Sequence, residues 1–324
     1  MPDQGFVESK RQAARIACAQ ALATGQTFGL ALAEALDAFP HRLKFVLHAG
    51  TPKTGTKALQ TALYRGVDAL AQAGVWYPPA LVDPEYKKHQ YLVSLLIAGD
   101  GAALTRAFEE IVRSAPPQTR TIVLSSEGFY QHWWDFAPES KELLRQLASL
   151  VDLEFWACFR EPVEFALTQY AQLLRNPREF APAYGLDAGL EEMLEDEWFV
   201  QRLDYLGFVF ELDELIGNDR VRLFRYGRDI VARVFDALGV AASDDAAERI
   251  NPSLRQPGVE LMRIVNRYEL SAGEKHAAAA LVLELDQMIG DRAEELRASP
   301  AAVRRIEELT GRGWAAIEQR FAPA

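Results

Sequence analysis

The sequence predicts a doubly wound α/β fold, in which helices cover both faces of a parallel sheet. The first observation is that short apolar runs typical of buried strands alternate along the chain with segments of helical spacing. The second is a loop of small, hydroxylated and cationic residues that follows the first strand, where a helix begins. With 324 residues, 49% of them apolar, the chain can bury a substantial core as one large domain or somewhat more.

The chain is expected to open with a helical N-terminal extension over residues 1–40, followed by an α/β domain over 41–324. Residues 9–38 are rich in Ala, Leu, Gln and Glu at helical spacing. The first strand is expected from His41 to His48. A helix over 58–73 follows, because its apolar residues recur with a helical period, and Gly74 ends it.

The middle of the chain predicts three more strands. VWYPP, from Val75, is a short strand ended by two prolines. Helices are expected over 83–98 and 101–114. TIVLSS at 121–126 and LEFWACF at 153–159 are apolar runs of the length of buried strands.

The last part of the chain is mainly helical. Its expected elements are helices at 161–175 and 229–239, a fifth strand at 221–226, and an almost wholly helical C-terminal region from about residue 258. Polar and proline-bearing stretches at 176–186 and 241–258 are expected to be loops.

Composition narrows the class of function. The net charge of −11 argues against binding nucleic acid or an anionic membrane through bulk charge. No stretch has the roughly 18 to 20 apolar residues that span a bilayer, and no secretion signal is evident, so a cytoplasmic protein is expected. The histidines and the two cysteines, Cys18 and Cys158, show no ligand spacing, so no metal site is expected. Cys158 lies in an apolar run, which favours a buried free thiol.

The loop GTPKTGTK, from Gly50 to Lys57, holds two glycines, three threonines and two lysines. A helix N-terminus offers unpaired N–H groups and the positive end of its dipole, and glycines let the backbone approach an anion closely. The sequence therefore predicts a site for a phosphate-like group. The ATP/GTP loop is GxxxxGK[ST], whereas here Thr56 follows Gly55 and the lysine is displaced to Lys53.

That displaced lysine makes the loop resemble the 5′-phosphosulfate loop of sulfotransferases that use 3′-phosphoadenosine 5′-phosphosulfate (PAPS), commonly PKTGT[TS]. The resemblance implies that Lys53 faces the bridging oxygen of the phosphosulfate. It also implies a 5′-phosphate site made by Thr54, Gly55, Thr56 and Lys57. Lys57 departs from the usual Thr or Ser, which removes a hydroxyl and adds a cation.

A second segment, FREPVEFALTQYAQ, supports the same resemblance. Family members place an Arg at this strand end and a Ser eight residues later on the 3′-phosphate of PAPS. Arg160 matches the Arg, and Thr168 stands in the place of the Ser. More diffusely, GVWYPP, SSE and RINPSL resemble a bacterial branch of the family.

The resemblance implies transfer of a sulfuryl group from PAPS to a hydroxyl or amine of an acceptor, such as a carbohydrate or another small molecule, without a metal. Lys53 would stabilise the leaving phosphate. The general base is expected to be His89, in EYKKHQYL, or Glu127, at the end of TIVLSSE. Each has a plainer alternative: His89 could be a solvated loop residue, and Glu127 could cap the next helix or orient Lys53. His48 is expected to pack in the core.

Two other groups are candidates as well. Trp133 and Trp134 could line an acceptor pocket or belong to the core. Asn251, Ser253 and Arg255 could close over the nucleotide.

Two other classes of function stay open. One is an ATP- or GTP-dependent kinase with a distorted phosphate loop, which would need a lysine followed by Ser or Thr after Gly55 and an Asp at a strand end for Mg²⁺. The other is a catalytically silent nucleotide-binding protein that uses its N-terminal helices to pair with a partner.

Overall fold

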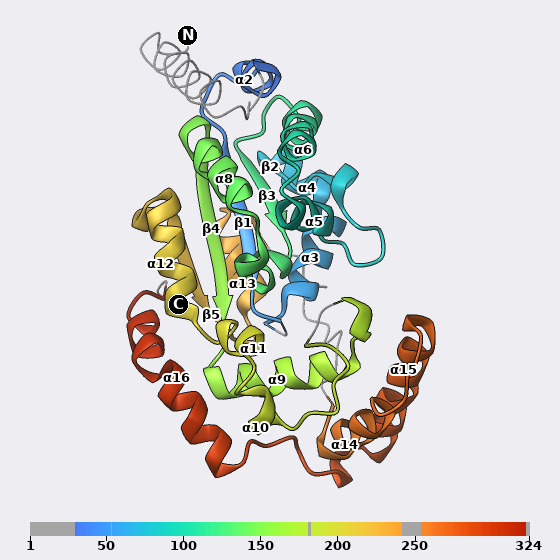
Figure 1. Ribbon diagram of the computed structural model, residues 1–324. Helices are drawn as coiled ribbons and strands as arrows, with labels where there is room; N and C mark the ends of the chain where they lie inside the picture. Colours follow the sequence, from blue (N-terminus) through green and yellow to red (C-terminus); the bar gives the residue numbers. More distant parts are fainter. Residues whose placement is uncertain (1–29, 53, 181–182, 242–253, 322–324) are drawn as a thin grey trace. The chain divides into compact units, whose positions relative to one another are not determined.

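A computed structural model of the protein describes residues 30–52, 54–180, 183–241 and 254–321 (Figure 1). Its centre is a sheet in the order β2-β3-β1-β4-β5, in which every neighbouring pair is parallel. The strands are β1 (Lys44–Gly50), β2 (Val75–Trp76), β3 (Thr121–Ser125), β4 (Asp152–Phe159) and β5 (Val221–Arg225). The predicted parallel α/β fold is therefore confirmed.

The described residues form two compact units by their contacts. Unit 1 comprises the described parts of Met1–Phe159, Gly207–Glu248 and Arg320–Ala324, and holds the sheet. Its helices are α2 (Leu30–Asp37), α3 (Thr56–Arg65), α4 (Val67–Gln72), α5 (Gln90–Ala98), α6 (Gly101–Ser114), α7 (Gly128–Gln131), α8 (Pro138–Leu150), most of α12 (Tyr205–Ile216) and α13 (Ile230–Ala237).

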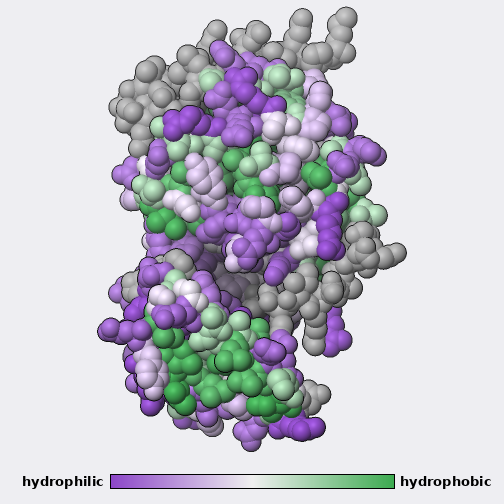
Figure 2. Space-filling model, turned by 90° about the vertical axis from the view of Figure 1, so that its right-hand side faces the viewer, coloured by the Kyte–Doolittle hydropathy of each residue, from purple (hydrophilic) through white to green (hydrophobic). Residues whose placement is uncertain are grey.

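Unit 2 comprises the described parts of Arg160–Leu206 and Arg249–Gln319 and is helical. Its helices are α9 (Pro162–Arg175), α10 (Leu190–Met193), α11 (Glu197–Gln201), α14 (Gln256–Val265), α15 (Ala272–Ile289) and α16 (Pro300–Glu318). Short 3₁₀ turns in the two units span Pro79–Leu81, Trp133–Asp135, Arg178–Phe180, Asn218–Arg220 and Gly290–Arg292. Apolar side chains gather on the surface over α14 and α15, in the lower part of Figure 2.

Both faces of the sheet are buried, because successive strand residues point to opposite faces and both sets are apolar. One face packs Val46 of β1 against Leu59 of α3 and Ile230 of α13. On the other face the ring of Phe45 lies 6.1 Å from that of Phe108 in α6, between ring centroids. Helices on both faces make the sheet doubly wound, as predicted.

Several boundaries differ from the prediction. The first strand begins at Lys44 and continues to Gly50, and Gly66 divides the helix expected over 58–73. The helix expected from residue 83 begins only at Gln90, because residues 83–89 form a turn that Asp83 closes by accepting the N–H groups of Glu85 and Tyr86. The loop expected to reach 258 ends earlier, since α14 begins at Gln256.

Part of the N-terminal extension lies outside the described residues. Within it the structure describes α2, which agrees with the helical spacing of 9–38. Helices α8, α10, α11 and α12 are additions to the prediction. No helix in the described ranges is both long and apolar enough to cross a bilayer.

Candidate functional site

The loop after β1 lies at the carboxyl edge of the sheet, beside the end of β4. Gly50 pairs in register with Cys158, and the N–H of Thr51 donates to the Cys158 carbonyl over 3.0 Å. The hydroxyl of Thr51 lies 3.3 Å from the same carbonyl oxygen. The first residue of the loop is therefore fixed to the neighbouring strand.

Threonine hydroxyls hold the loop in its curve. Thr54 donates from Oγ1 to the Thr51 carbonyl over 2.6 Å, and its Oγ1 lies 3.4 Å from Thr56 Oγ1. Thr51, Thr54 and Thr56 are all buried. The hydroxyl proton of Thr54 is thus used inside the loop, and Thr56 is then the donor in the contact between the two hydroxyls.

The glycines of the loop are required by close approach and by backbone conformation. A Cβ on Gly50 would lie 2.8 Å from Thr56 Oγ1. Gly55 has φ +77°, and a Cβ there would lie 2.8 Å from Cγ2 of Ile230 in α13. A side chain at either position would change the shape of the loop.

The N-terminus of α3 has no side-chain cap. Gly55 is its N-cap residue. The first hydrogen bond of the helix runs from the N–H of Leu59 to the Gly55 carbonyl. The N–H groups of Thr56, Lys57 and Ala58 therefore have no partner within the helix. Lys57 is half-buried and adds a cation to this turn. These features are compatible with the anion site expected from the sequence, which stays a prediction.

Glu127 follows β3 and is connected to α3. Gln60, in the second turn of α3, donates from Nε2 to Glu127 Oε2 over 3.3 Å and to Ser125 Oγ over 3.2 Å. Lys88 Nζ lies 3.9 Å from the same carboxylate oxygen. No side chain caps the following helix α7, so Glu127 does not have the capping role considered above. It is a partly exposed carboxylate held beside the helix that begins at the loop.

His48 belongs to this network and is buried, as predicted. Its Nδ1 lies 2.9 Å from Ser125 Oγ, and burial lowers its pKa to about 4. The imidazole is therefore neutral near pH 7, and it fixes the Ser125 hydroxyl between β1 and α3. Gln60 and Ser125 were not among the candidates: Gln60 stands in no recognisable motif, and Ser125 belongs to the SSE segment, from which no role was predicted for it.

His89 is fully buried, and both of its ring nitrogens face backbone groups. Nδ1 accepts the N–H of Ser125 over 3.1 Å, and Nε2 lies 3.2 Å from the Pro78 carbonyl. Burial lowers its pKa to about 4. His89 is thus not the solvated loop residue considered above. In this conformation it joins the end of β3 to the segment after β2, with neither nitrogen open to an acceptor.

Unit 2 holds the other predicted phosphate-binding residues on one face at the start of α9. Arg160, directly after β4, has its Nε 3.0 Å from Glu164 Oε2. The Thr168 hydroxyl lies 3.0 Å from the Glu164 carbonyl oxygen and 2.9 Å from the Phe165 carbonyl oxygen, and it donates to these helix carbonyls. Arg160, Glu164 and Thr168 thus recur at intervals of four residues. Both residues therefore contact Glu164, Arg160 at its carboxylate and Thr168 at its main-chain carbonyl, and the sequence analysis did not consider that carboxylate.

The remaining candidates divide into three groups. Lys53, Asn251 and Ser253 lie outside the described residues. Trp133 is a core residue, not part of a pocket lining: it is fully buried, and its indole N–H donates to Glu211 over 2.8 Å. Arg255 starts α14 and binds Asp286 through its backbone N–H and its guanidinium.

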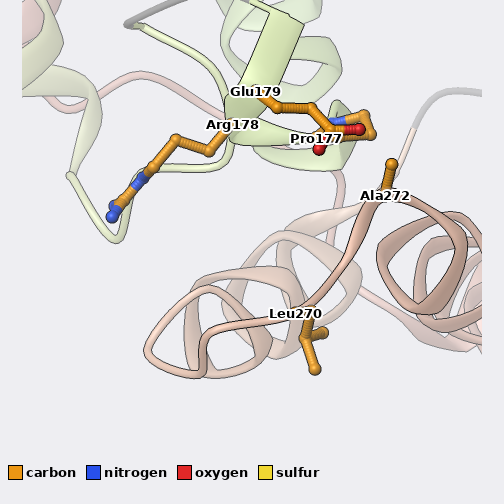
Figure 3. Close-up of a pocket in the computed structure, with 5 residues that line it drawn as sticks. All are labelled: Pro177, Arg178, Glu179, Leu270 and Ala272. Carbon is orange, nitrogen blue, oxygen red and sulfur yellow. The ribbon is translucent and has the colours of Figure 1, made fainter.

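Two cavities are lined by residues outside the loop. One, of about 320 Å³, is in unit 2 between Arg178 and the start of α15 (Figure 3). The other, of about 400 Å³, is in unit 1 and is lined by residues 80–83 with Gln90 and Tyr91. The hydroxyl of Ser126 donates to Gln90 Oε1 over 3.1 Å, and this hydrogen bond connects the cavity to the end of β3. No group of three or more His, Cys, Asp or Glu suited to a metal occurs among the described residues.

Comparison with known proteins gives weak likenesses. No family model matches the sequence, and no curated protein matches it significantly. Among solved structures, a sulfotransferase from Alicyclobacillus acidocaldarius is 16% identical, over 82% of this chain and all of that one, with a TM-score of 0.41. A retinol dehydratase in complex with androsterone and the inactive cofactor PAP is 13% identical, over 90% of this chain and 84% of that one, with a TM-score of 0.28.

A structure from the PezAT toxin–antitoxin system of Streptococcus pneumoniae has the same TM-score of 0.28, at 12% identity over 89% of this chain and 99% of that one. These TM-scores lie below 0.5, so the case for a function rests on the residues of this chain.

Proposed function

We propose that the protein is a PAPS-dependent sulfotransferase that moves a sulfuryl group to a hydroxyl or amine of a small-molecule or carbohydrate acceptor. The observation that supports this most is the loop GTPKTGTK in its place between β1 and α3, with an uncapped helix N-terminus. Such a terminus suits a phosphate group, and the loop lysine precedes the final Gly-Thr instead of following the glycine.

In this proposal the residues of the loop have separate roles. The N–H groups of Thr56 and Lys57, the Thr56 hydroxyl and the Lys57 ammonium would hold the 5′-phosphate. Lys53 would neutralise the charge that develops on the phosphate as the sulfur–oxygen bond to it breaks. Thr54 would keep the loop in shape, because its hydroxyl already donates to Thr51.

We assign the general base to Glu127 in preference to His89. Glu127 is partly exposed and is held by Gln60 and Lys88, whereas both nitrogens of His89 face backbone groups. Glu127 would accept the proton of the acceptor hydroxyl as its oxygen bonds to sulfur. His89 would act as a positioning residue, since it holds the backbone of Ser125 two residues before Glu127.

Arg160 and Thr168 remain the proposed partners of the 3′-phosphate, from the sequence motif and from their shared neighbour Glu164. An arginine with a neighbouring hydroxyl suits a dianionic phosphate. Binding would require the Thr168 hydroxyl to turn from its helix carbonyls, and Arg160 to share or leave Glu164.

The deciding experiment is calorimetry of the purified chain with adenosine 3′,5′-bisphosphate, ATP and GTP, each with and without Mg²⁺. We expect the bisphosphate to bind most tightly and without magnesium. Turnover of labelled PAPS against a panel of sugars, phenols and amines then tests catalysis and identifies the acceptor. Preference for ATP or GTP with Mg²⁺ would favour the kinase, and binding without any turnover would favour the silent protein.

The loop lysine gives a direct test of the mechanism. Lys53→Ala should lower the rate of sulfuryl transfer by about 10² to 10³ with the fold retained, because a placed charge is lost. Lys44→Ala is the matched control, since Lys44 begins the same strand at its other end. Transfer by the Lys53 variant at the rate of the control would refute the role.

A further inference from the structure

Helix α15 is apolar on most of its circumference, yet only one narrow stripe of it is covered. Its buried residues are Lys275, Ala279, Val282 and Asp286, which recur along one line of the helix. The opposite side exposes Leu281 by 57% and Met288 by 75%, with Leu285 between them. A helix that is apolar on both sides is normally covered on both sides.

Neighbouring α14 extends this surface. Leu261 and Ile264 lie on its exposed side, and Tyr268, just beyond its end, is 69% exposed. The α14–α15 patch is defined here as Leu261, Ile264, Tyr268, Leu281, Leu285 and Met288, and the apolar surface is visible in Figure 2. Exposed fractions of this size on side chains of about 200 Å² each amount to roughly 600 Å².

The roughly 600 Å² of the patch is enough for the apolar part of a stable dimer interface. A standard interface buries about 800 Å² on each partner, and a little over half of it is apolar. A patch of roughly 600 Å² already supplies the apolar part, whereas it is at the upper limit of what a monomer leaves exposed.

We propose that the α14–α15 patch is a two-fold dimer interface that binds a second copy of this chain. The two helices from each copy would form a four-helix arrangement. In a two-fold contact the same surface of each copy must complement itself. The sequence of α15 meets this condition if the two-fold axis passes near Leu281. With antiparallel α15 helices, Leu285, four residues after Leu281, meets Ala277 of the other copy, four residues before it.

One carboxylate near this axis already has a partner in its own chain. Glu274 would face Met288 of the partner copy, but its carboxylate is turned back to Ser271, whose N–H lies 2.9 Å from Glu274 Oε2 in a capping box. The patch itself contains no cation, and the chain carries a net charge of −11, so an anionic membrane is a poorer partner.

The test is the oligomeric state of the full chain by sedimentation and light scattering. We expect a dimer for the wild type and a shift to monomer, with at least tenfold weaker association, for Leu281→Glu and Met288→Glu. Phe210→Glu is the matched control: it changes an apolar side chain, 59% exposed on α12, to the same acid. It should remain dimeric. Circular dichroism and thermal unfolding check that each variant is folded.

A cross-link tests the symmetry without depending on a disruptive substitution. Leu281→Cys, in a chain with Cys18→Ser, should form a disulfide between two copies under mild oxidation, because a residue on the axis meets itself. Phe210→Cys in the same background should not. The proposal is overturned if the wild type is monomeric at about 100 μM, or if the glutamate variants remain as dimeric as the control.

Discussion

His89 and Glu127 show how far a residue's role depends on surroundings that motifs do not record. Both follow predicted elements, and both are chemically able to take a proton. The structure gives His89 two backbone partners and Glu127 a partly open position beside Gln60. Burial was the missing information, because the polar sequence around His89 does not reveal that the ring packs against Tyr77.

The first prediction separates these two residues. Glu127→Gln should lower the turnover number by about 10² to 10⁴ and leave the affinity for adenosine 3′,5′-bisphosphate unchanged, because it removes only the base. His89→Asn should mainly lower thermal stability. Initial rates, calorimetry and melting curves for both variants check this. A His89 variant that folds as well as the wild type and is inactive would reverse the assignment.

The second prediction concerns the carboxylate between Arg160 and Thr168. Glu164→Gln should tighten binding of adenosine 3′,5′-bisphosphate by several-fold, since it removes a competing negative charge; pairs of this exposure contribute about 1 kcal/mol or less. Arg160→Ala should weaken it. Binding of adenosine 5′-monophosphate, which has no 3′-phosphate, should change little in either variant. Equal changes for both ligands would make these residues structural.

Whether a strand or helix could be predicted depends on how clearly the local sequence shows its apolar pattern. Buried strands β3 and β4 were placed within one residue, because their apolar runs are bounded by polar residues and turns. Helix α8 has clear helical spacing at Leu143, Leu144 and Leu147 and could have been predicted. The start of α5 could not, because the turn before it is set by hydrogen bonds from Asp83.

The third prediction tests the geometry that joins β1 to α3. Gly55→Ala should destabilise the protein by more than Gly239→Ala, although both glycines have left-handed φ, +77° and +72°. Gly239 has open space around it, so alanine there costs about 1 kcal/mol of conformational strain alone. At Gly55 the added methyl also meets Ile230. Urea unfolding gives the difference, and similar losses at the two positions would contradict it.

For the molecule as a whole, the site depends on a buried polar layer between β1, β3 and the segment after β2. Its two histidines have a pKa lowered by burial from 6.5 to about 4. The unfolded chain therefore binds more protons than the folded chain between these values. Stability is full above pH 6.5 and falls as the pH falls through that range.

The fourth prediction puts a size on this effect. The free energy of unfolding should fall between pH 7 and pH 5 by about 2 kcal/mol for each of His48 and His89. Urea unfolding across this range measures the slope. In His89→Asn the slope should be about half that of the wild type, whatever the loss of stability at pH 7. An unchanged slope would mean that His89 has the same pKa in the folded and the unfolded protein.

The central place of β1 also bears on when a newly made chain can first form the proposed nucleotide site. One edge of β1 pairs with β3 and the other with β4, so its neighbours are synthesised some 75 to 110 residues after it. The hydrogen bond from the Thr51 N–H to the Cys158 carbonyl, which fixes the turn at the start of the loop, can form only after Cys158 has been synthesised. A ribosome-bound fragment that ends before residue 152 should therefore carry the whole loop sequence and still lack a nucleotide site.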